Sequence, residues 1–287
     1  MPSLWIAGAR PKTLPAAVAP VLVGTGAAHL DGGVVVWKAL VALGVSLALQ
    51  IGVNYANDYS DGVKGTDDDR VGPLRLVGSG LVPAKHVKIA ALGFLALGGV
   101  LGFVLAATSS WWLLLVGAAA LAAAWGYTGG KNPYGYRALG EVSVFVFFGL
   151  VAVLGTTFVQ LGTVNLASVA GAIGIGALAC NILVANNLRD RAKDELVNKR
   201  TLAVVLGDTN SRRLFVALIV VAFGCLLVLV PVTPWALLGF AAAPFAWRST
   251  RAVAGGAEGE ALIAVLGDTG RAELVYAVGL TVGLLLA

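Results

Sequence analysis

The sequence predicts an all-α, polytopic membrane protein with about nine transmembrane helices. Of its 287 residues, 58% are hydrophobic and only 12% are charged. The apolar residues gather in runs of about 20, the length that a helix needs to cross a bilayer of roughly 30 Å. The 38 glycines suit close packing of helices in lipid. This composition excludes a soluble enzyme built on one large core.

Apolar runs divide the chain into nine candidate spans, the last two of them short. Pro11 and Pro15 help to set where the first span begins. The spans are Leu14–Leu30, Val34–Ala56, Val87–Ala107, Trp111–Tyr127, Leu139–Val159, Leu166–Ala185, Leu214–Val230, Trp235–Trp247 and Ala272–Ala287. We expect one transmembrane domain over residues 1–287.

Charged residues gather on one side of the predicted bilayer. If connections alternate between sides, every lysine and arginine except Lys38 falls on the same side. The positive-inside rule makes that side cytoplasmic, with the N-terminus inside and the C-terminus outside. Of the fifteen acidic residues, only Asp31 falls outside. Because carboxylates contribute little to topology, their bias indicates chemistry at the cytoplasmic face of a cell membrane.

The most acidic stretch of the chain, Asn57–Arg70, follows the second apolar run directly. It holds five aspartates and two cations. Asn54, Asn57, Asp58 and Asp61 follow the i, i+3, i+4, i+7 stripe of one helix face. Carboxylate and amide oxygens without nearby His or Cys suit Mg2+, which takes further ligands from a substrate's phosphates. The alternative interpretation is a solvated acidic loop.

A second stretch, Ala185–Thr201, repeats this design after another apolar run. Asn186 and Asp190 stand four residues apart, as Asn57 and Asp61 do, and Asp194 follows four residues later. Two such helix faces can meet across a bundle and hold metal between them. The repetition therefore favours a metal site over a solvated loop.

Cations lie in the cytoplasmic connections beside these acids. Arginines 70 and 75 are candidates to bind phosphate oxygens or to pair with the aspartates. The stretch Tyr127–Glu141, YTGGKNPYGYRALGE, places Lys131 and Arg137 among tyrosines and glycines, which suits an anionic aromatic ligand or a departing phosphate. Interfacial anchoring is the alternative interpretation. Arg10 and Lys12 before the first span are either topogenic anchors or contacts to an anionic substrate.

The motifs resemble those of the UbiA superfamily of intramembrane prenyltransferases, whose two aspartate motifs end the second and sixth helices. Within it, the chain looks like the 1,4-dihydroxy-2-naphthoate polyprenyltransferase branch of menaquinone biosynthesis. The similarity runs from Arg10 to about Gly207 through RPKTLPAAVAPVLVGTG, NDYSDGVKGTDDDRVGPLRLV, YTGGKNPYGYRALGE and NNLRDRAKDELVNKRTLAVVLG. Two departures from the superfamily pattern are Gly65, where other branches place an acid, and Asn198, which replaces a usual glycine.

The resemblance implies a central cavity with the aspartates at its cytoplasmic end, and roles for particular residues. Asp61, Asp190 and Lys131 are the expected catalytic residues. The expected metal ligands are Asn57, Asp58, Asp61, Asp67, Asp190 and Asp194. The expected substrate-binding residues are Asn54, Arg70, Arg75, Tyr127, Lys131, Tyr134, Arg137, Asn186, Asn187 and Lys199.

The reaction that the resemblance implies is transfer of a polyprenyl group from polyprenyl diphosphate to 1,4-dihydroxy-2-naphthoate, with Mg2+ as cofactor. Diphosphate and CO2 leave, and the product is demethylmenaquinol. Alternatives are another aromatic acceptor, such as 4-hydroxybenzoate or homogentisate, or a membrane transporter. A transporter predicts polar residues leading to the opposite face, yet the outer loops carry almost no charge. We expect the lipid bilayer as a partner and no nucleic acid.

Overall fold

The computed structural model describes residues 2–65, 74–130 and 132–287. Asp67, Arg70 and Lys131 therefore lie outside the described residues. Within those ranges the chain consists of helices and connecting segments, with one isolated bridge between Arg137 and Arg200. The prediction of an all-α, polytopic membrane protein is confirmed.

The helices follow one another along the chain with short connections. The first half contains α1 (Pro2–Ala9), the 3-10 turn η1 (Pro11–Thr13), α2 (Pro15–Leu30), α3 (Val36–Lys64), α4 (Ala84–Thr108) and α5 (Leu113–Gly126). The second half contains the 3-10 turn η2 (Tyr134–Tyr136), α6 (Gly140–Val144), the π-helix η3 (Phe145–Leu154), α7 (Gly155–Leu161), α8 (Leu166–Leu196), α9 (Leu202–Leu229), η4 (Pro234–Ala242), α10 (Ala243–Ala254) and α11 (Ala261–Leu285).

Each predicted span falls on a helical stretch, but the count of nine stays a prediction. By length and composition, five helical stretches among the described residues can each cross a membrane: α3, α4, the continuous stretch Gly140–Leu161 (α6, η3 and α7), α8 and α9. A sixth results if Leu4–Thr13 and Pro15–Leu30, bent by 47° from one another, form one span. The predicted span Trp235–Trp247 crosses from η4 into α10, and the last begins at Ala261 rather than Ala272.

Local sequence signals explain where several helices begin and end. Asn165 caps α8: its side-chain oxygen accepts from the backbone N–H of Ser168, and the Ser168 hydroxyl accepts from the N–H of Asn165. At Gly65 the backbone turns left-handed, with φ of 72°, and ends α3. Helices α3 and α8 thus extend beyond their apolar runs, and both aspartate stretches begin on helical turns.

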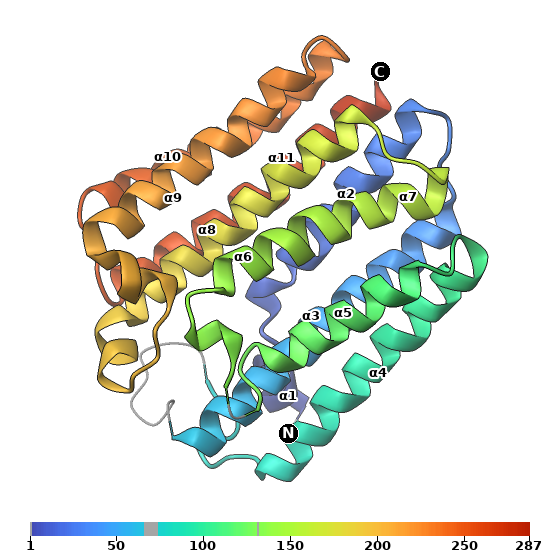
Figure 1. Ribbon diagram of the computed structural model, residues 1–287. Helices are drawn as coiled ribbons and strands as arrows, with labels where there is room; N and C mark the ends of the chain where they lie inside the picture. The colour runs from blue at the N-terminus through green and yellow to red at the C-terminus, as the bar shows by residue number, and fades with distance from the viewer. Residues whose placement is uncertain (1, 66–73, 131) are drawn as a thin grey trace.

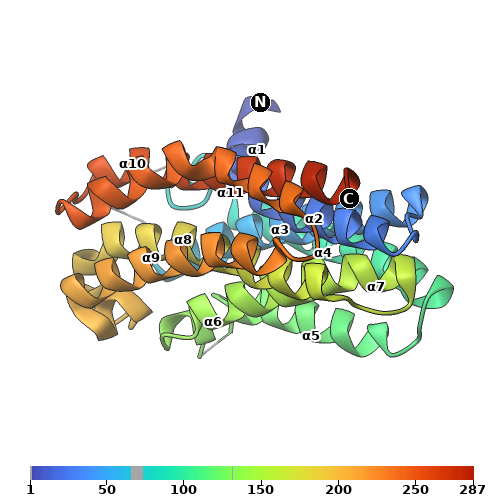
Figure 2. The ribbon, with the colours of Figure 1, turned by 90° about the horizontal axis from the view of Figure 1, so that it is seen from above.

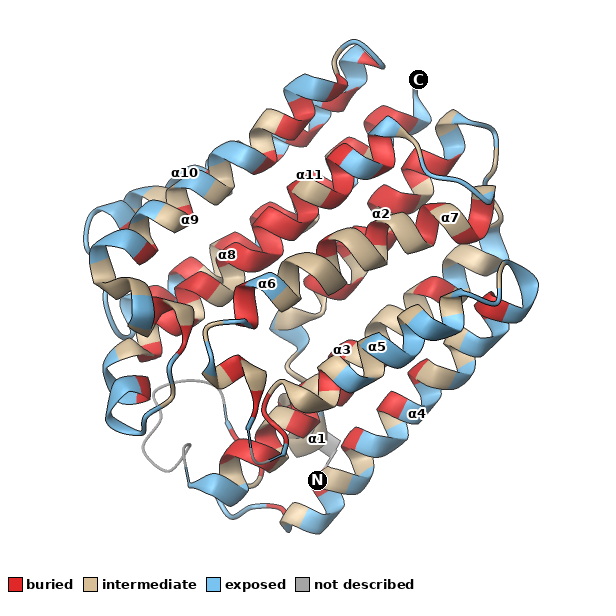
Figure 3. Ribbon diagram, viewed as in Figure 1, coloured by how far each residue is buried: buried red, intermediate tan, exposed pale blue. Residues whose placement is uncertain are grey.

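Helix α8 lies at the centre of the bundle (Figure 3). In its apolar window 78% of residues are buried, against 22–28% in the other four long apolar helices. It packs against α2, η3, α9 and α11. Gly149 and Gly176 bring η3 and α8 into backbone contact, since a Cβ at Gly149 would stand 2.7 Å from the Gly176 Cα.

The chain brings its polar segments to one end of the bundle. Figure 1 shows the end of α3, the turn at η2 and the connection from α8 to α9 at the same end, while α1 stands off one side in Figure 2. At the opposite end, the Lys38 ammonium donates to the carbonyls of Thr108 (3.0 Å) and Val159 (2.7 Å). These contacts tie α3 to the ends of α4 and α7.

Candidate active site

A cavity of about 1080 Å³ runs along the inside of the bundle. Most of its lining is apolar and comes from α3, α4, α5, η3 and α8. Charged, amide and tyrosine side chains gather in the lining near the C-terminal ends of α3 and α8. Among them are Arg10, Lys12, Asn54, Asn57, Asp61, Arg75, Tyr127, Tyr134, Asn186, Asn187, Arg189 and Lys199. One cavity therefore presents an apolar surface for a long tail and a polar surface for charge.

The first aspartate set faces this cavity with Asn54, Asn57 and Asp61. The Asn54 amide is held by the Ala9 carbonyl (2.9 Å) and the Thr13 hydroxyl (3.0 Å). Asp61, only 3% exposed, accepts a hydrogen bond of 2.8 Å from the Tyr136 hydroxyl at Oδ1. The predicted helix face is present for these three residues.

Asp58, expected beside the metal, faces away from the cavity. It is fully buried, and its carboxylate oxygens accept from the backbone N–H groups of Leu76 (2.8 Å) and Val77 (3.0 Å). Asp58 therefore fixes the segment after residue 73 against α3. It lies at the edge of the helical stripe, where the returning chain covers it.

The second set is held by cations. Arg189 lines the cavity and donates to both oxygens of Asp190, each at 2.7 Å, and to Asn186 Oδ1 at 2.9 Å. Asp194 lies 3.4 Å from the Lys199 ammonium. Asn187 lines the cavity and donates to the buried Glu141 carboxylate at 2.9 Å. Asp190 and Asp194 are both 7% exposed and stand behind these cations rather than on the lining.

Tyr136 joins the two sets and is the main residue that the sequence analysis missed. Its hydroxyl binds Asp61, while the ammonium groups of Lys64 and Lys199 lie 5.0 and 5.3 Å from its ring centre. The Thr128 hydroxyl donates to Asn57 Oδ1 at 2.8 Å. Both Thr128 and Tyr136 belong to the glycine- and tyrosine-rich stretch, which was the available signal, but spacing alone did not single them out.

Other predicted residues divide between the cavity and the surface. Tyr127 and Tyr134 line it and pack edge to face, with ring centres 5.6 Å apart. Burial raises the pKa of the Tyr134 phenol, which stays protonated beside the Ala123 carbonyl (2.8 Å). Arg75 is buried and lines the cavity. Arg137, expected at the substrate, is exposed and does not line it.

The donor chemistry suits a hard divalent cation, although no preformed cluster is present. Within the described ranges, no three His, Cys, Asp or Glu side chains stand close enough to hold a metal. The two sets nevertheless supply carboxylate and amide oxygens without His or Cys, which is the ligand preference of Mg2+. The residues therefore fit Mg2+ in chemical type, with Asp67 outside the described part.

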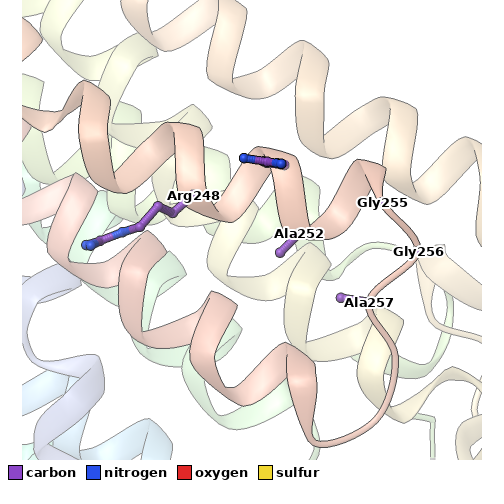
Figure 4. A pocket seen from close by; sticks show the side chains of 6 residues that line it. Arg248, Ala252, Gly255, Gly256 and Ala257 are labelled. Atoms are coloured by element: carbon purple, nitrogen blue, oxygen red, sulfur yellow. The ribbon is translucent and has the colours of Figure 1, made fainter.

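A second, shallower pocket lies at the turn after α10 (Figure 4). It is lined by Arg248, Arg251, Ala252, Gly255, Gly256 and Ala257, and Arg248 already pairs with Asp268 at 3.3 Å. With no carboxylate or amide side chain in its lining, it lacks the donors that the large cavity offers.

Comparison with known proteins agrees with this architecture. The chain is 54% identical to a 1,4-dihydroxy-2-naphthoate octaprenyltransferase of Mycobacterium tuberculosis, over 95% of this chain and 94% of that protein. It is 39% identical to the enzyme of the same name from Escherichia coli, over 77% and 74%. A UbiA homolog from Aeropyrum pernix superposes with a TM-score of 0.74 at 15% identity, covering 95% of this chain and 98% of that one.

A UbiA homolog from Archaeoglobus fulgidus, solved with DMAPP and Mg2+, superposes with a TM-score of 0.67 at 15% identity, covering 99% of both chains. At that identity the likeness shows the fold. The sequence profile of the UbiA prenyltransferase family matches residues 17–260. This chain belongs to the UbiA prenyltransferase family.

Proposed function

We propose that this protein transfers a polyprenyl group from polyprenyl diphosphate to 1,4-dihydroxy-2-naphthoate in menaquinone biosynthesis. The observation that carries the proposal is the identity of 54% to the Mycobacterium tuberculosis 1,4-dihydroxy-2-naphthoate octaprenyltransferase, over nearly the whole length of both chains. The cavity agrees, because it joins an apolar wall to a polar end bearing Asp61, Arg75 and Lys199. We treat residues 1–287 as one catalytic domain.

The reaction breaks the bond between the allylic carbon and the diphosphate oxygen, and diphosphate leaves with the electron pair. The ring carbon that bears the carboxylate then forms the new bond to the allylic carbon. Loss of the ring carboxylate as CO2 returns its electrons to the ring and restores aromaticity, giving demethylmenaquinol. The first step most needs the protein, because negative charge builds on the leaving oxygen.

The carboxylate and amide oxygens at the polar end would hold Mg2+, which would supply positive charge to offset the charge on the leaving oxygen. Its ligands in this proposal are Asn57, Asp61, Asp67, Asp190 and Asp194. Asp58 is left out because the returning backbone at Leu76 and Val77 buries its carboxylate completely, on the side away from the cavity. The Archaeoglobus fulgidus homolog solved with DMAPP and Mg2+ supports this use of metal.

Cations of the chain bind the diphosphate in this proposal. Arg75, Arg189 and Lys199 line the polar end, and Arg70 and Lys131 are further candidates outside the described residues. Arg10 and Lys12 line the same cavity, which supports contact with an anionic substrate beyond any role in topology. The apolar lining binds the polyprenyl tail and keeps water from the allylic carbon.

One assay of purified protein tests the function. With 1,4-dihydroxy-2-naphthoate, polyprenyl diphosphate and Mg2+, we expect a prenylated, decarboxylated naphthalene product by mass spectrometry. Parallel reactions with 4-hydroxybenzoate and homogentisate serve as acceptor controls. Product from either control acceptor, and none from the naphthoate, refutes the acceptor assignment.

We further propose that the polar end faces the cytoplasm in the cell membrane. The test places single cysteines in a background that lacks Cys180 and Cys225. Cysteines after Gly62 and Lys193 should react with an impermeant reagent only from the cytoplasmic side. Cysteines near Asp31 and Thr233 should react only from outside. A cysteine of either group that reacts from the side expected for the other group overturns this orientation.

A further inference from the structure

Two hydroxyl groups between α5 and α6 each donate to one oxygen-bearing residue of the first aspartate set. The Thr128 hydroxyl donates to Asn57 Oδ1, and the Tyr136 hydroxyl donates to Asp61 Oδ1, both at 2.8 Å. Asn57 and Asp61 stand four residues apart, one helical turn, at the end of α3. Thr128 and Tyr136, eight positions apart in the chain, therefore each contact one member of the pair Asn57 and Asp61, and both members of that pair face the cavity.

Both donors are themselves held in place. Thr128 is 3% exposed, and its carbonyl accepts from the Lys64 ammonium at 2.6 Å. The ammonium groups of Lys64 and Lys199 lie over the Tyr136 ring, 5.0 and 5.3 Å from its centre. The two hydroxyls thus sit on anchored groups, as orientation of a ligand requires.

Each hydroxyl takes up only part of the hydrogen-bonding capacity of its acceptor. An ionised carboxylate offers about four lone-pair sites over two oxygens, and an amide oxygen offers two. The Tyr136 hydroxyl occupies one site on Asp61, and the Thr128 hydroxyl occupies one on Asn57. Because both acceptors line the cavity, a hydrogen bond to one of their sites fixes the direction in which the side chain faces the cavity.

We propose that Thr128 and Tyr136 are positioning residues that orient Asn57 and Asp61 to hold a divalent cation. The proposal rests on the proposed function only for its metal and its substrate. Tyr136 carries a second connection, because Lys199 on its ring also lies 3.4 Å from Asp194 of the second set. Its ring and its hydroxyl therefore act separately: the hydroxyl orients Asp61, and the ring sets Lys199 between the two sets.

Near-isosteric substitutions separate these contributions. Thr128→Val and Tyr136→Phe each delete one hydroxyl, and Tyr136→Leu also deletes the ring. Thr128→Ser keeps the hydroxyl that Thr128→Val removes. Thr108→Val and Tyr59→Phe are matched controls: the Thr108 hydroxyl bonds the Val104 carbonyl at the far end, and Tyr59 lies beneath Lys88 outside the cavity lining.

The primary measurement is Mn2+ binding to purified full-length protein by electron paramagnetic resonance, with and without inorganic diphosphate. Loss of a partner that orients a metal ligand typically weakens affinity about 10- to 100-fold. We expect that loss for Thr128→Val and Tyr136→Phe, a greater loss for Tyr136→Leu, and wild-type binding for Thr128→Ser and both controls. Thermal unfolding of each variant checks that it is folded.

Two results overturn the proposal: a wild-type protein that binds no Mn2+ in either condition, or hydroxyl deletions whose Mn2+ Kd stays within about twofold of wild type. Product formation is a separate arm. If wild-type protein forms no prenylated naphthoate but the deletions still weaken Mn2+ binding, the positioning role stands and the proposed acceptor reaction fails.

Discussion

The two aspartate sets share a spacing in sequence but differ in what holds them. At the end of α3, Asn57 and Asp61 accept hydrogen bonds from neutral hydroxyls and stand on the cavity lining. On α8, Asp190 and Asp194 pair with Arg189 and Lys199. The first set therefore presents its oxygens on the cavity lining, whereas the two carboxylates of the second set do not line the cavity.

Replacing one aspartate of each set tests this difference most strongly. Asp61→Ala and Asp190→Ala should each lower turnover more than about 1000-fold, equivalent to about 4 kcal/mol in the barrier. Asp190→Ala should also lower the unfolding temperature sharply. It leaves the guanidinium of Arg189, 2% exposed, without its carboxylate, and breaking a buried pair costs about 3–5 kcal/mol.

A double variant provides the control for that stability effect. Arg189→Met with Asp190→Leu removes both charges, so it should recover much of the unfolding temperature without recovering turnover. Equal unfolding temperatures for Asp61→Ala and Asp190→Ala would show that the two sets are held alike. Turnover above about a tenth of wild type in both would refute a direct metal role.

A cation outside both sets gives the next largest effect. Lys131→Ala should lower turnover roughly 100- to 1000-fold, because a removed donor to a leaving group typically costs about 2.7 to 4 kcal/mol. Lys131→Arg keeps the charge for topology but changes the shape of the donor, and it should also lose rate. If Lys131→Ala turned over like wild type at saturating levels of both substrates, the lysine would have a role in membrane topology and none in catalysis.

The smallest effect belongs to the opposite end of the bundle. Lys38→Met removes donors to the carbonyls of Thr108 and Val159 and to the Ser109 hydroxyl. It should destabilise the fold by about 1 kcal/mol, because the site is partly exposed to water, and leave turnover unchanged. Thermal unfolding and steady-state kinetics on the same preparation check both points. Slower turnover at full stability would contradict a site confined to one end.

The sequence predicted the helical class and the family because hydropathy and motif spacing are local properties. Periodicity also placed Asn54, Asn57 and Asp61 on one helix face, as observed. The helical period also placed Asp58 on this face, but Asp58 lies at the edge of the face. Which edge of a helix face another segment covers is decided by tertiary contacts, which the period does not encode. Here the backbone N–H groups of Leu76 and Val77 return over that edge.

The contacts that connect the sets were beyond sequence reasoning for a similar reason. Tyr136 and Lys199 lie 63 positions apart and meet only through the fold, as do Thr128 and Asn57. The sequence marked the glycine- and tyrosine-rich stretch as a whole, but no period within it separates Tyr136 at the aspartate from Tyr134 at Ser143. Arg137 was expected at the substrate as a cation among tyrosines and glycines, yet the residue is exposed.

The close backbone contact between η3 and α8 leaves no room for a larger side chain at Gly149, whereas the opposite wall of the cavity has room for larger side chains. A methyl group at Gly149 would collide with α8, 2.7 Å from the Ala172 carbonyl oxygen. On the facing wall, Gly102 and Gly117 line the cavity, and a Cβ at either meets no atom within 4 Å. Larger side chains there would shorten the room for a tail while sparing the helix packing. Substitutions meant to limit the length of the accepted tail therefore belong on α4 and α5.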